Sequence, residues 1–304
     1  MTFEQRLKLF KRASARGGLY FALWLIRRLP YRLLQGVMHV FIFLWFRLSV
    51  RLRRIARESL KIALGDEIDE PTRKKIIRDC FENIGCSMTD LIYFTEYPGG
   101  VKEKFAIDGR QHLDAALALG RGVIIVTAHF GNFCLMMLEL AQLGYPVNCI
   151  IRRARDAIIA QKIYTSMNKV GVKPIYSLPA ARSVKESLAA LKRNETLCIL
   201  LDQHYGSGSG VMVDFFGRKA ATATGPVVLA NRTGAPVVPI FTIREGDRYR
   251  LIIEPPLAME DAANEEEFVL VNVKRITRLI ERYIRRYPAE WGWMHRRWKN
   301  RETA

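Results

Sequence analysis

Residues 122–144 read GVIIVTAHFGNFCLMMLELAQLG and contain a strand, a turn and a helix in that order. The run is apolar and rich in β-branched residues up to His129, as expected of a buried strand. A turn with Gly131 and Asn132 follows, and the remaining residues have the apolar content of a buried helix that ends at Gly144. This order is typical of an α/β fold.

The same alternation continues through the rest of the chain. Apolar, β-branched runs predict further strands at 147–151, 196–201, 236–243 and 249–255. Helical spacing of apolar residues predicts helices at 51–64, 71–94, 156–170, 181–193, 222–234 and 264–287. No internal repeat or low-complexity linker interrupts them, so we expect one catalytic domain.

The chain carries 48 Lys and Arg against 30 Asp and Glu, a net charge of +18, and most of the excess lies at its two ends. Residues 1–62 hold 14 basic and 2 acidic residues, residues 274–301 hold 10 and 2, and the remainder holds 24 and 26. Because the middle is almost neutral, we expect no nucleic-acid partner and favour an anionic lipid surface.

In residues 17–54, arginines bracket aromatic and aliphatic runs, a composition typical of a lipid interface. The uncharged runs at 17–26 and 33–46 are each shorter than the ~20 residues that span a bilayer. We therefore expect an N-terminal hydrophobic helical membrane anchor over residues 1–60, either a hairpin or an interfacial segment, and a catalytic domain over 61–304. Basic flanks place both ends of the anchor on the cytoplasmic side. The alternative is a pair of helices buried in the protein's own core.

The cysteines and histidines give no sign of a metal site or a disulfide framework. Five cysteines are an odd number, and none pairs with another cysteine or a histidine at ligand spacing. No small-residue cleavage site follows the first apolar run. We expect a reduced, cytoplasmic location for the bulk of the chain, with no metal and no bound cofactor.

His129 stands at the carboxyl end of its predicted strand, where the active sites of open α/β sheets collect. Gly131 lets a substrate approach the backbone, and Asn132 is a suitable cap for the following helix. The alternative is a core histidine beside a helix cap, because one histidine alone is weak evidence. His129 is thus a candidate catalytic residue, and Gly131 and Asn132 are candidate substrate-binding residues.

Three segments in order resemble one family. AHFGNF at 128–133 resembles the histidine motif of the lysophospholipid and glycerophosphate acyltransferase superfamily, in particular its lipid A late-acyltransferase branch. LDQHYGSGSGVMVDFFGRKAATATGPVVLANRTGAPVVPIF at 201–241 resembles the second family block, and YPAEWGWMHRRWK at 287–299 resembles the C-terminal signature. The resemblance implies a glycerophosphate-acyltransferase-like mixed sheet flanked by helices, and a location at the cytoplasmic face of the bacterial inner membrane.

The resemblance also implies an activity. A fatty acyl group moves from an acyl carrier protein or coenzyme A thioester, which is a donor substrate and not a cofactor, to a hydroxyl of lipid A or of a related glycolipid or lysolipid. His129 would take the proton of the acceptor hydroxyl as its oxygen attacks the thioester carbonyl.

Cys134 occupies the position where the family pattern has an Asp or Glu, and a neutral thiol poorly replaces an orienting carboxylate. Four interpretations follow. In the first, which we favour, Asp202 at the end of its own predicted strand supports His129 instead. In the second, His129 acts without an acid, because a thioester is already activated. In the third, Cys134 and His129 form a nucleophilic pair. Finally, the chain is a catalytically silent lipid-binding pseudoenzyme. Glu139 is too far along the helix to substitute and is expected on a solvated face.

Three more residues are candidate substrate contacts. Arg152 follows a predicted strand and is suited to clamping a phosphate of the acceptor or of the donor's pantetheine arm, unless it belongs to a solvated basic loop. Gln203 lies in the second family block, next to Asp202. Arg296 lies among three tryptophans, a composition that fits contact with lipid headgroups. The alternative for this end of the chain is a tryptophan-rich lid on the core.

Overall fold

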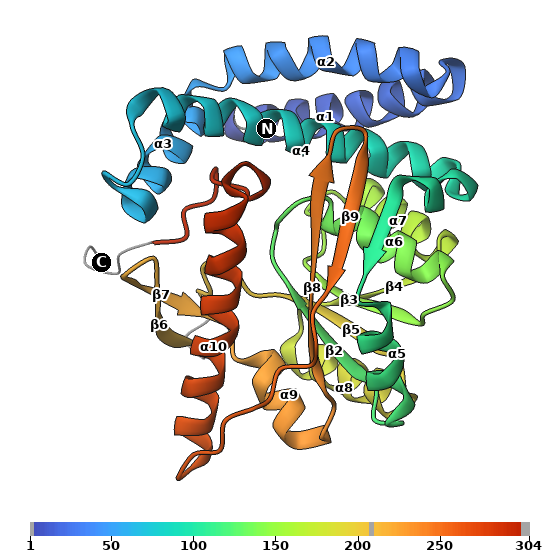
Figure 1. The fold of residues 1–304 in the computed structure, drawn as a ribbon. Helices are drawn as coiled ribbons and strands as arrows, with labels where there is room; N and C mark the ends of the chain where they lie inside the picture. Colours follow the sequence, from blue (N-terminus) through green and yellow to red (C-terminus); the bar gives the residue numbers. More distant parts are fainter. Residues whose placement is uncertain (1–2, 207–209, 299–304) are drawn as a thin grey trace.

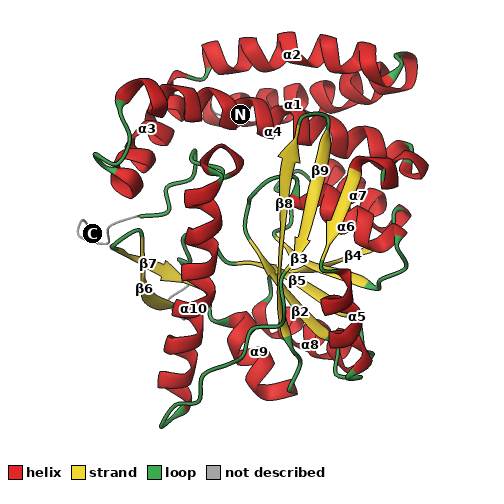
Figure 2. Ribbon diagram, viewed as in Figure 1, coloured by secondary structure: helices red, strands yellow, loops and turns green. Residues whose placement is uncertain are grey.

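The structure, a computed structural model, describes residues 3–206 and 210–298. Within them a seven-stranded sheet has the order β1-β9-β8-β2-β5-β3-β4 (Figures 1 and 2). Its strands are β1 (Phe105–Asp108), β2 (Val123–Thr127), β3 (Val147–Ile151), β4 (Val172–Tyr176), β5 (Thr196–Leu200), β8 (Val237–Glu245) and β9 (Arg248–Ile253). Only β8 and β9 pair antiparallel. The predicted α/β class with a mixed sheet is confirmed.

Strand β2 runs between β5 and β8, parallel to both, and all five of its residues are buried. Val126 is in register with Ile199 of β5 and with Pro239 of β8. Because parallel neighbours end at the same edge of a sheet, the residues that follow β2 and β5 lie close together. This edge carries the candidate site.

Helices flank the sheet, as the strand and helix alternation predicts. They are α5 (Arg110–Ala118), α6 (Phe133–Gln142), α7 (Ala157–Lys169), α8 (Ala180–Lys192), α9 (Gly225–Thr233) and α10 (Glu265–Arg286). The sequence patterns do not predict β1, α5, β4, or the separate hairpin of β6 (Val211–Phe215) and β7 (Arg218–Thr222). Strand β4 contains Lys173 and Pro174, which its position at the edge of the sheet tolerates.

Four helices precede the sheet: α1 (Phe3–Arg28), α2 (Tyr31–Leu48), α3 (Val50–Leu64) and α4 (Glu70–Glu96). Both α1 and α2 pack on α4, and Figure 1 shows them along one end of the molecule. Among the described helices, none alone is long and apolar enough to cross a membrane, and α2 and α3 pass that test only as a pair bent by 77°. The expected N-terminal anchor therefore gains no support from a spanning helix. The expected boundary at residue 60 falls inside α3 and stays a prediction.

A buried hydrogen-bond network fastens the N-terminal helices to the sheet. The Asp90 carboxylate of α4 accepts from the Tyr31 hydroxyl of α2 over 2.7 Å and from the Tyr249 hydroxyl of β9 over 2.6 Å. Asn132 donates to the Tyr249 oxygen over 3.2 Å. Burial and the adjacent Asp90 charge raise the pKa of both tyrosines, so both remain donors. Hydrogen bonds therefore connect α2 to the turn that follows β2.

The chain after α10 folds back over the sheet through the short helix η3 (Pro288–Glu290). The Gly131 amide donates to the Glu290 carbonyl oxygen over 2.9 Å, and the Arg244 amide donates to Glu290 Oε1 over 3.2 Å. Glu290 Oε2 is buried and has no hydrogen-bond partner in the described part of the chain. Burial raises the pKa of Glu290 to about 7, so a proton is held at the point where the C-terminal segment meets the β2 turn.

We expect Glu290 to make the free energy of unfolding depend on pH. Its pKa is about 7 when folded against 4.5 ordinarily, so between these values the folded chain holds one more proton. This stabilisation is complete below about pH 4.5 and is lost as the pH rises through 7, by on the order of 3 kcal/mol. Urea unfolding of the wild type and Glu290→Gln from pH 5 to pH 8 should show the wild type losing stability relative to the variant. Parallel pH profiles would contradict this assignment.

Candidate active site

His129 lies two residues beyond β2, at the carboxyl edge of the sheet. Its carbonyl oxygen accepts from the Gly292 amide over 3.3 Å, which fixes the backbone against the C-terminal segment. Its side chain is 31% exposed and therefore accessible to a substrate. The ring centroid lies 5.0 Å from that of Phe133 and 5.5 Å from that of His295. An accessible imidazole at this position is compatible with proton transfer.

Asp202 follows β5 and holds the imidazole from the buried side. Its Oδ1 lies 2.9 Å from His129 Nδ1, and Trp291 Nε1 donates to its Oδ2 over 2.8 Å. Burial alone would raise the pKa of Asp202, but the neighbouring His129 and the hydrogen bonds from His129 and Trp291 lower it to about 2. Asp202 is therefore ionised at neutral pH. Because a carboxylate only accepts, His129 Nδ1 carries a proton and Nε2 is the basic atom when the ring is neutral.

Asn132 and Gly131 shape the turn between β2 and α6. The Asn132 side chain caps α6 by accepting from the Leu135 amide over 3.1 Å, as predicted, and it also donates to the Ser87 carbonyl oxygen. Gly131 has a φ of +56°, and a Cβ there would overlap the carbonyl oxygen of Thr242 in β8. What approaches the Gly131 backbone is thus the protein's own strand. The predicted substrate contacts of Gly131 and Asn132 stay predictions.

Cys134 does not contribute to the His129 contacts. Burial, together with Cys149, raises the pKa of its thiol to about 12, so the thiol stays neutral near pH 7. Among the described side chains, its contacts include no hydrogen bond to His129. Glu139 corrects another expectation: the sequence predicts a solvated face, but Glu139 is only 1% exposed, and burial raises its pKa. It lies on the packed side of α6, which is apolar on nearly every face.

Gln203 is connected to His129 through His295, whereas Arg296 faces a cavity beside α3. Gln203 Nε2 is 3.1 Å from His295 Nε2, which links the second family block to the C-terminal segment. Arg296 is exposed and lines a cavity of about 500 Å³ between α3 and the C-terminal segment. Ser59 of α3 also lines this cavity and donates to the His295 carbonyl oxygen over 3.3 Å. A polar cavity thus lies next to the C-terminal segment that carries His295, and His129 is not among its lining residues.

The sequence patterns do not predict that Trp291 and Arg297 hold the site together. Trp291 is fully buried and supports Asp202, and Arg297 is fully buried and donates to the carbonyl oxygens of Gln203 and Ala221. The tryptophan-rich C-terminal segment is the sequence signal that points to them. For Trp291 and Trp293, which have no exposed surface, the alternative of a lid on the core is correct and contact with headgroups is wrong.

Arg152 lies apart from these groups. It follows β3, which β5 separates from β2 in the sheet, and its side chain is exposed. Two strand spacings of about 4.8 Å place the β3 backbone roughly 10 Å from that of β2. Arg152 thus shares the sheet edge with His129, but no described contact joins the two residues. Within the described residues, no group of three or more His, Cys, Asp or Glu side chains is arranged to hold a metal ion.

Comparisons with known proteins agree with the sequence blocks. The lipid A biosynthesis lauroyltransferase of Escherichia coli (strain K12) is 27% identical, over 92% of this chain and 89% of its own. The palmitoleoyltransferase of the same strain is 28% identical, over 93% and 90%. The crystal structure of the 1-acyl-sn-glycerophosphate acyltransferase from Thermotoga maritima covers 83% of this chain and 97% of its own, with 13% identity and a TM-score of 0.39, too low to support a conclusion.

The family assignment rests on the length of the match. The sequence model of the bacterial lipid A biosynthesis acyltransferases covers residues 3–300, which is nearly the whole chain. The relatives above carry acyltransferase names and align over about nine-tenths of their own length. The chain therefore belongs to the bacterial lipid A biosynthesis acyltransferase family and is an acyltransferase.

Proposed function

We propose that this protein transfers a fatty acyl group from a carrier-protein or coenzyme A thioester to a hydroxyl of lipid A or a related glycolipid or lysolipid, with His129 as the general base. The observation that carries the proposal is the chain of hydrogen bonds from Trp291 through the ionised Asp202 to His129 Nδ1. It leaves Nε2 as the basic atom of a partly exposed ring. The names of the two Escherichia coli relatives support lipid A as the acceptor class.

The geometry supports direct transfer within a ternary complex. The acceptor hydroxyl gives its proton to His129 Nε2 while its oxygen attacks the thioester carbonyl carbon. The tetrahedral intermediate collapses, the carbon–sulfur bond breaks, and the imidazolium returns the proton to the departing thiolate. Asp202 stabilises the imidazolium between these steps, as a buried carboxylate does in comparable triads. No bound cofactor is needed, because the acyl group arrives already activated.

Acceptor binding would use the polar side of the site. Arg296 and the cavity beside α3 offer a cation to a phosphate of the acceptor, and Gln203 offers an amide near the reacting hydroxyl. Arg152, further along the same edge, is suited to a second phosphate on the acceptor or on the donor's pantetheine arm. Gly131 and Asn132 would support substrate binding by holding the turn that carries His129 in place.

We also propose that the protein works at the cytoplasmic face of the bacterial inner membrane. Large apolar side chains are about half or more exposed on α1 and α2, among them Tyr20 (58%), Phe21 (50%), Trp24 (54%), Leu33 (61%) and Phe43 (59%). Arginines flank these positions in the sequence. An apolar surface next to cations fits the interface of an anionic bilayer.

A silent lipid-binding protein is the alternative, and it gains no support. It depends on the absence of an acid at Cys134. Asp202 offers that carboxylate from the neighbouring strand, and it lies within hydrogen-bond distance of His129.

We expect His129→Ala to lower the rate of acyl transfer by ~10³-fold or more, because the base is removed, and Asp202→Asn to lower it by ~10²- to 10⁴-fold. Transfer of a radiolabelled acyl group to a lipid extract measures both. Lys185→Glu, an exposed change on α8, serves as the control, and thermal unfolding verifies folding. His129→Ala retaining more than about a tenth of the wild-type rate would rule out a general base at this position.

Cys134→Ser should keep the rate within about threefold of the wild type, because among the described side chains the neutral thiol makes no hydrogen bond to His129. Cys134→Glu should give no gain and should lower the unfolding temperature, because the added carboxylate enters apolar surroundings. The same transfer assay, together with mass spectrometry of the quenched enzyme, checks both variants. Loss of turnover in Cys134→Ser, with an acyl thioester on the wild-type Cys134, would establish the nucleophilic pair instead.

A further inference from the structure

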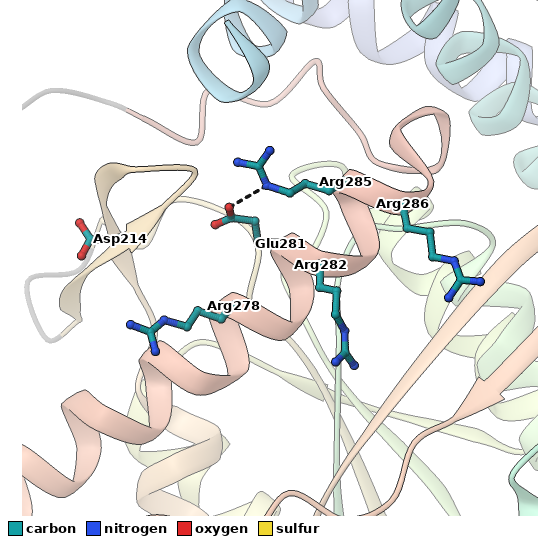
Figure 3. Close-up of a pocket in the computed structure, with 6 residues that line it drawn as sticks. All are labelled: Asp214, Arg278, Glu281, Arg282, Arg285 and Arg286. Carbon is teal, nitrogen blue, oxygen red and sulfur yellow. Dashed lines mark hydrogen bonds and ion pairs between the residues drawn. The ribbon is translucent and has the colours of Figure 1, made fainter. Parts of the chain in front are cut away.

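A basic surface groove of about 610 Å³ lies along the C-terminal half of α10. Figure 3 shows its six lining residues: Asp214, Arg278, Glu281, Arg282, Arg285 and Arg286. Five of them belong to α10, and Asp214 comes from the β6–β7 hairpin. The catalytic proposal above uses none of these residues. We call this surface the α10 groove.

The amphipathic pattern of α10 explains why the arginines are outside. Val273, Ile276, Ile280 and Ile284 recur at helical spacing and are almost completely buried in the core. The opposite face carries the four arginines of the groove, which are all exposed. Helix packing therefore fixes the backbone beneath the charges, while the guanidinium groups stay at the surface, where a partner can reach them.

The arginines of the groove are only partly neutralised within the protein. Arg282 pairs with Glu254 over 3.2 Å, and Arg285 pairs with Glu281 over 3.0 Å and with Glu67 over 2.7 Å. Arg278 and Arg286 have no ion pair among the described residues. Arg278 and Arg286 are eight residues apart, so the row of cations extends ~12 Å along the helix.

A row of this length fits a row of carboxylates better than it fits one phosphate. A single phosphate engages one or two guanidinium groups, whereas carboxylates spaced along an acidic helix can each meet one arginine in a bidentate contact. Charge complementarity of this kind also steers the encounter of two folded proteins. The chemistry of the groove thus favours an acidic protein partner.

We propose that the α10 groove is the docking surface of an acidic acyl carrier protein that delivers the thioester. The inference rests on the proposed function, because it names the donor of that reaction. It distinguishes a carrier-protein donor from coenzyme A, which has no protein surface to match the row of arginines.

The position of the groove suits delivery to His129. Arg286 is five residues before Trp291, so chain length alone limits their separation to ~18 Å, a span that a long flexible arm bridges. The hairpin on the other side of the groove is tied to the site as well, since the Arg297 guanidinium lies 5.2 Å from the Phe215 ring and donates to the Gln203 carbonyl oxygen. The thioester therefore has a short route to the imidazole.

The groove and the proposed lipid surface are formed by different helices. Helix α10 packs mainly against β6, α9 and η3, and its main contacts do not include α1 or α2. In Figure 1 the C-terminal half of α10, which carries the groove, points toward the end of the molecule where the N-terminal helices lie, and Arg285 pairs there with Glu67. A carrier docked in the groove would therefore contact other residues than those that we propose to meet the membrane.

The test compares full-length wild type with the double variant Arg278→Glu/Arg286→Glu. The double change Lys185→Glu/Lys192→Glu at two exposed positions of α8 is the control, because it alters the net charge by the same amount. Binding of purified lauroyl-acyl carrier protein is measured by biolayer interferometry. We expect the double variant to raise the Kd by ~10-fold or more and the control to leave it unchanged. The wild-type Kd should rise between 50 and 300 mM NaCl, because salt screens the attraction between exposed charges. The Debye length is about 10 Å at 0.1 M and shortens as salt is added. Among the described residues neither arginine makes an ion pair, so the unfolding temperature of the double variant should match that of the wild type.

Kinetics provide the second measurement. The double variant should raise the KM for lauroyl-acyl carrier protein by a similar factor, keep kcat, and keep the KM for lauroyl-CoA within about twofold. If the wild type binds the carrier and the double variant does not, but the wild type transfers from neither donor, the docking surface is upheld and the proposed function is refuted. If the wild type transfers from lauroyl-CoA but does not bind the carrier, or if all variants bind the carrier equally, the docking surface alone is refuted. If the double variant loses binding to phosphatidylglycerol vesicles but still binds the carrier, the groove binds lipid and the docking proposal is also refuted.

Discussion

The Asp202 carboxylate is buried between His129 and Trp291, and the arrangement of the whole site follows from the hydrogen bonds that its two oxygens require. A carboxylate removed from water costs several kcal/mol unless its oxygens receive strong hydrogen bonds. Here Oδ1 faces His129, 73 residues away in the chain, and Oδ2 faces Trp291, 89 residues away. Both bonds form only when β2, β5 and the C-terminal segment are in place. The geometry of the imidazole and the packing of the fold therefore depend on the same interaction.

Much of this site is predictable from short-range sequence patterns. The β-branched run before His129 predicts β2, and Asn132 predicts the cap of α6, because both signals depend on residues a few positions apart. Asp202 is identifiable as a partner because it follows its own strand as His129 follows β2, and parallel strands bring such residues to one edge. The resemblance to the family supplies the activity, which no periodicity contains.

The remainder depends on contacts between distant segments, and the sequence carries only indirect signs of them. A tryptophan-rich end is compatible with a lipid interface or a core lid, and the burial of Trp291 against Asp202 decides between them. Glu139 is polar and lies in an apolar helix, so spacing alone places it on a solvated face, yet the packing of α6 buries it. Strand β4 is hidden from pattern analysis because Lys173 and Pro174 are acceptable only at an edge, and edge position is a property of the assembled sheet.

The thiol at Cys134 has a physical explanation in the same interaction. In the imidazole of His129, Nδ1 has a single N–H, and Asp202 already accepts it. A second carboxylate at residue 134 would find no donor on that nitrogen, and it would lie in surroundings apolar enough to raise the pKa of the Cys134 thiol to about 12. Burying an unpaired carboxylate there is more costly than burying a neutral thiol. Because Asp202, directly after β5, already supplies the carboxylate, residue 134 on α6 needs no acid, and a neutral cysteine fits its apolar surroundings.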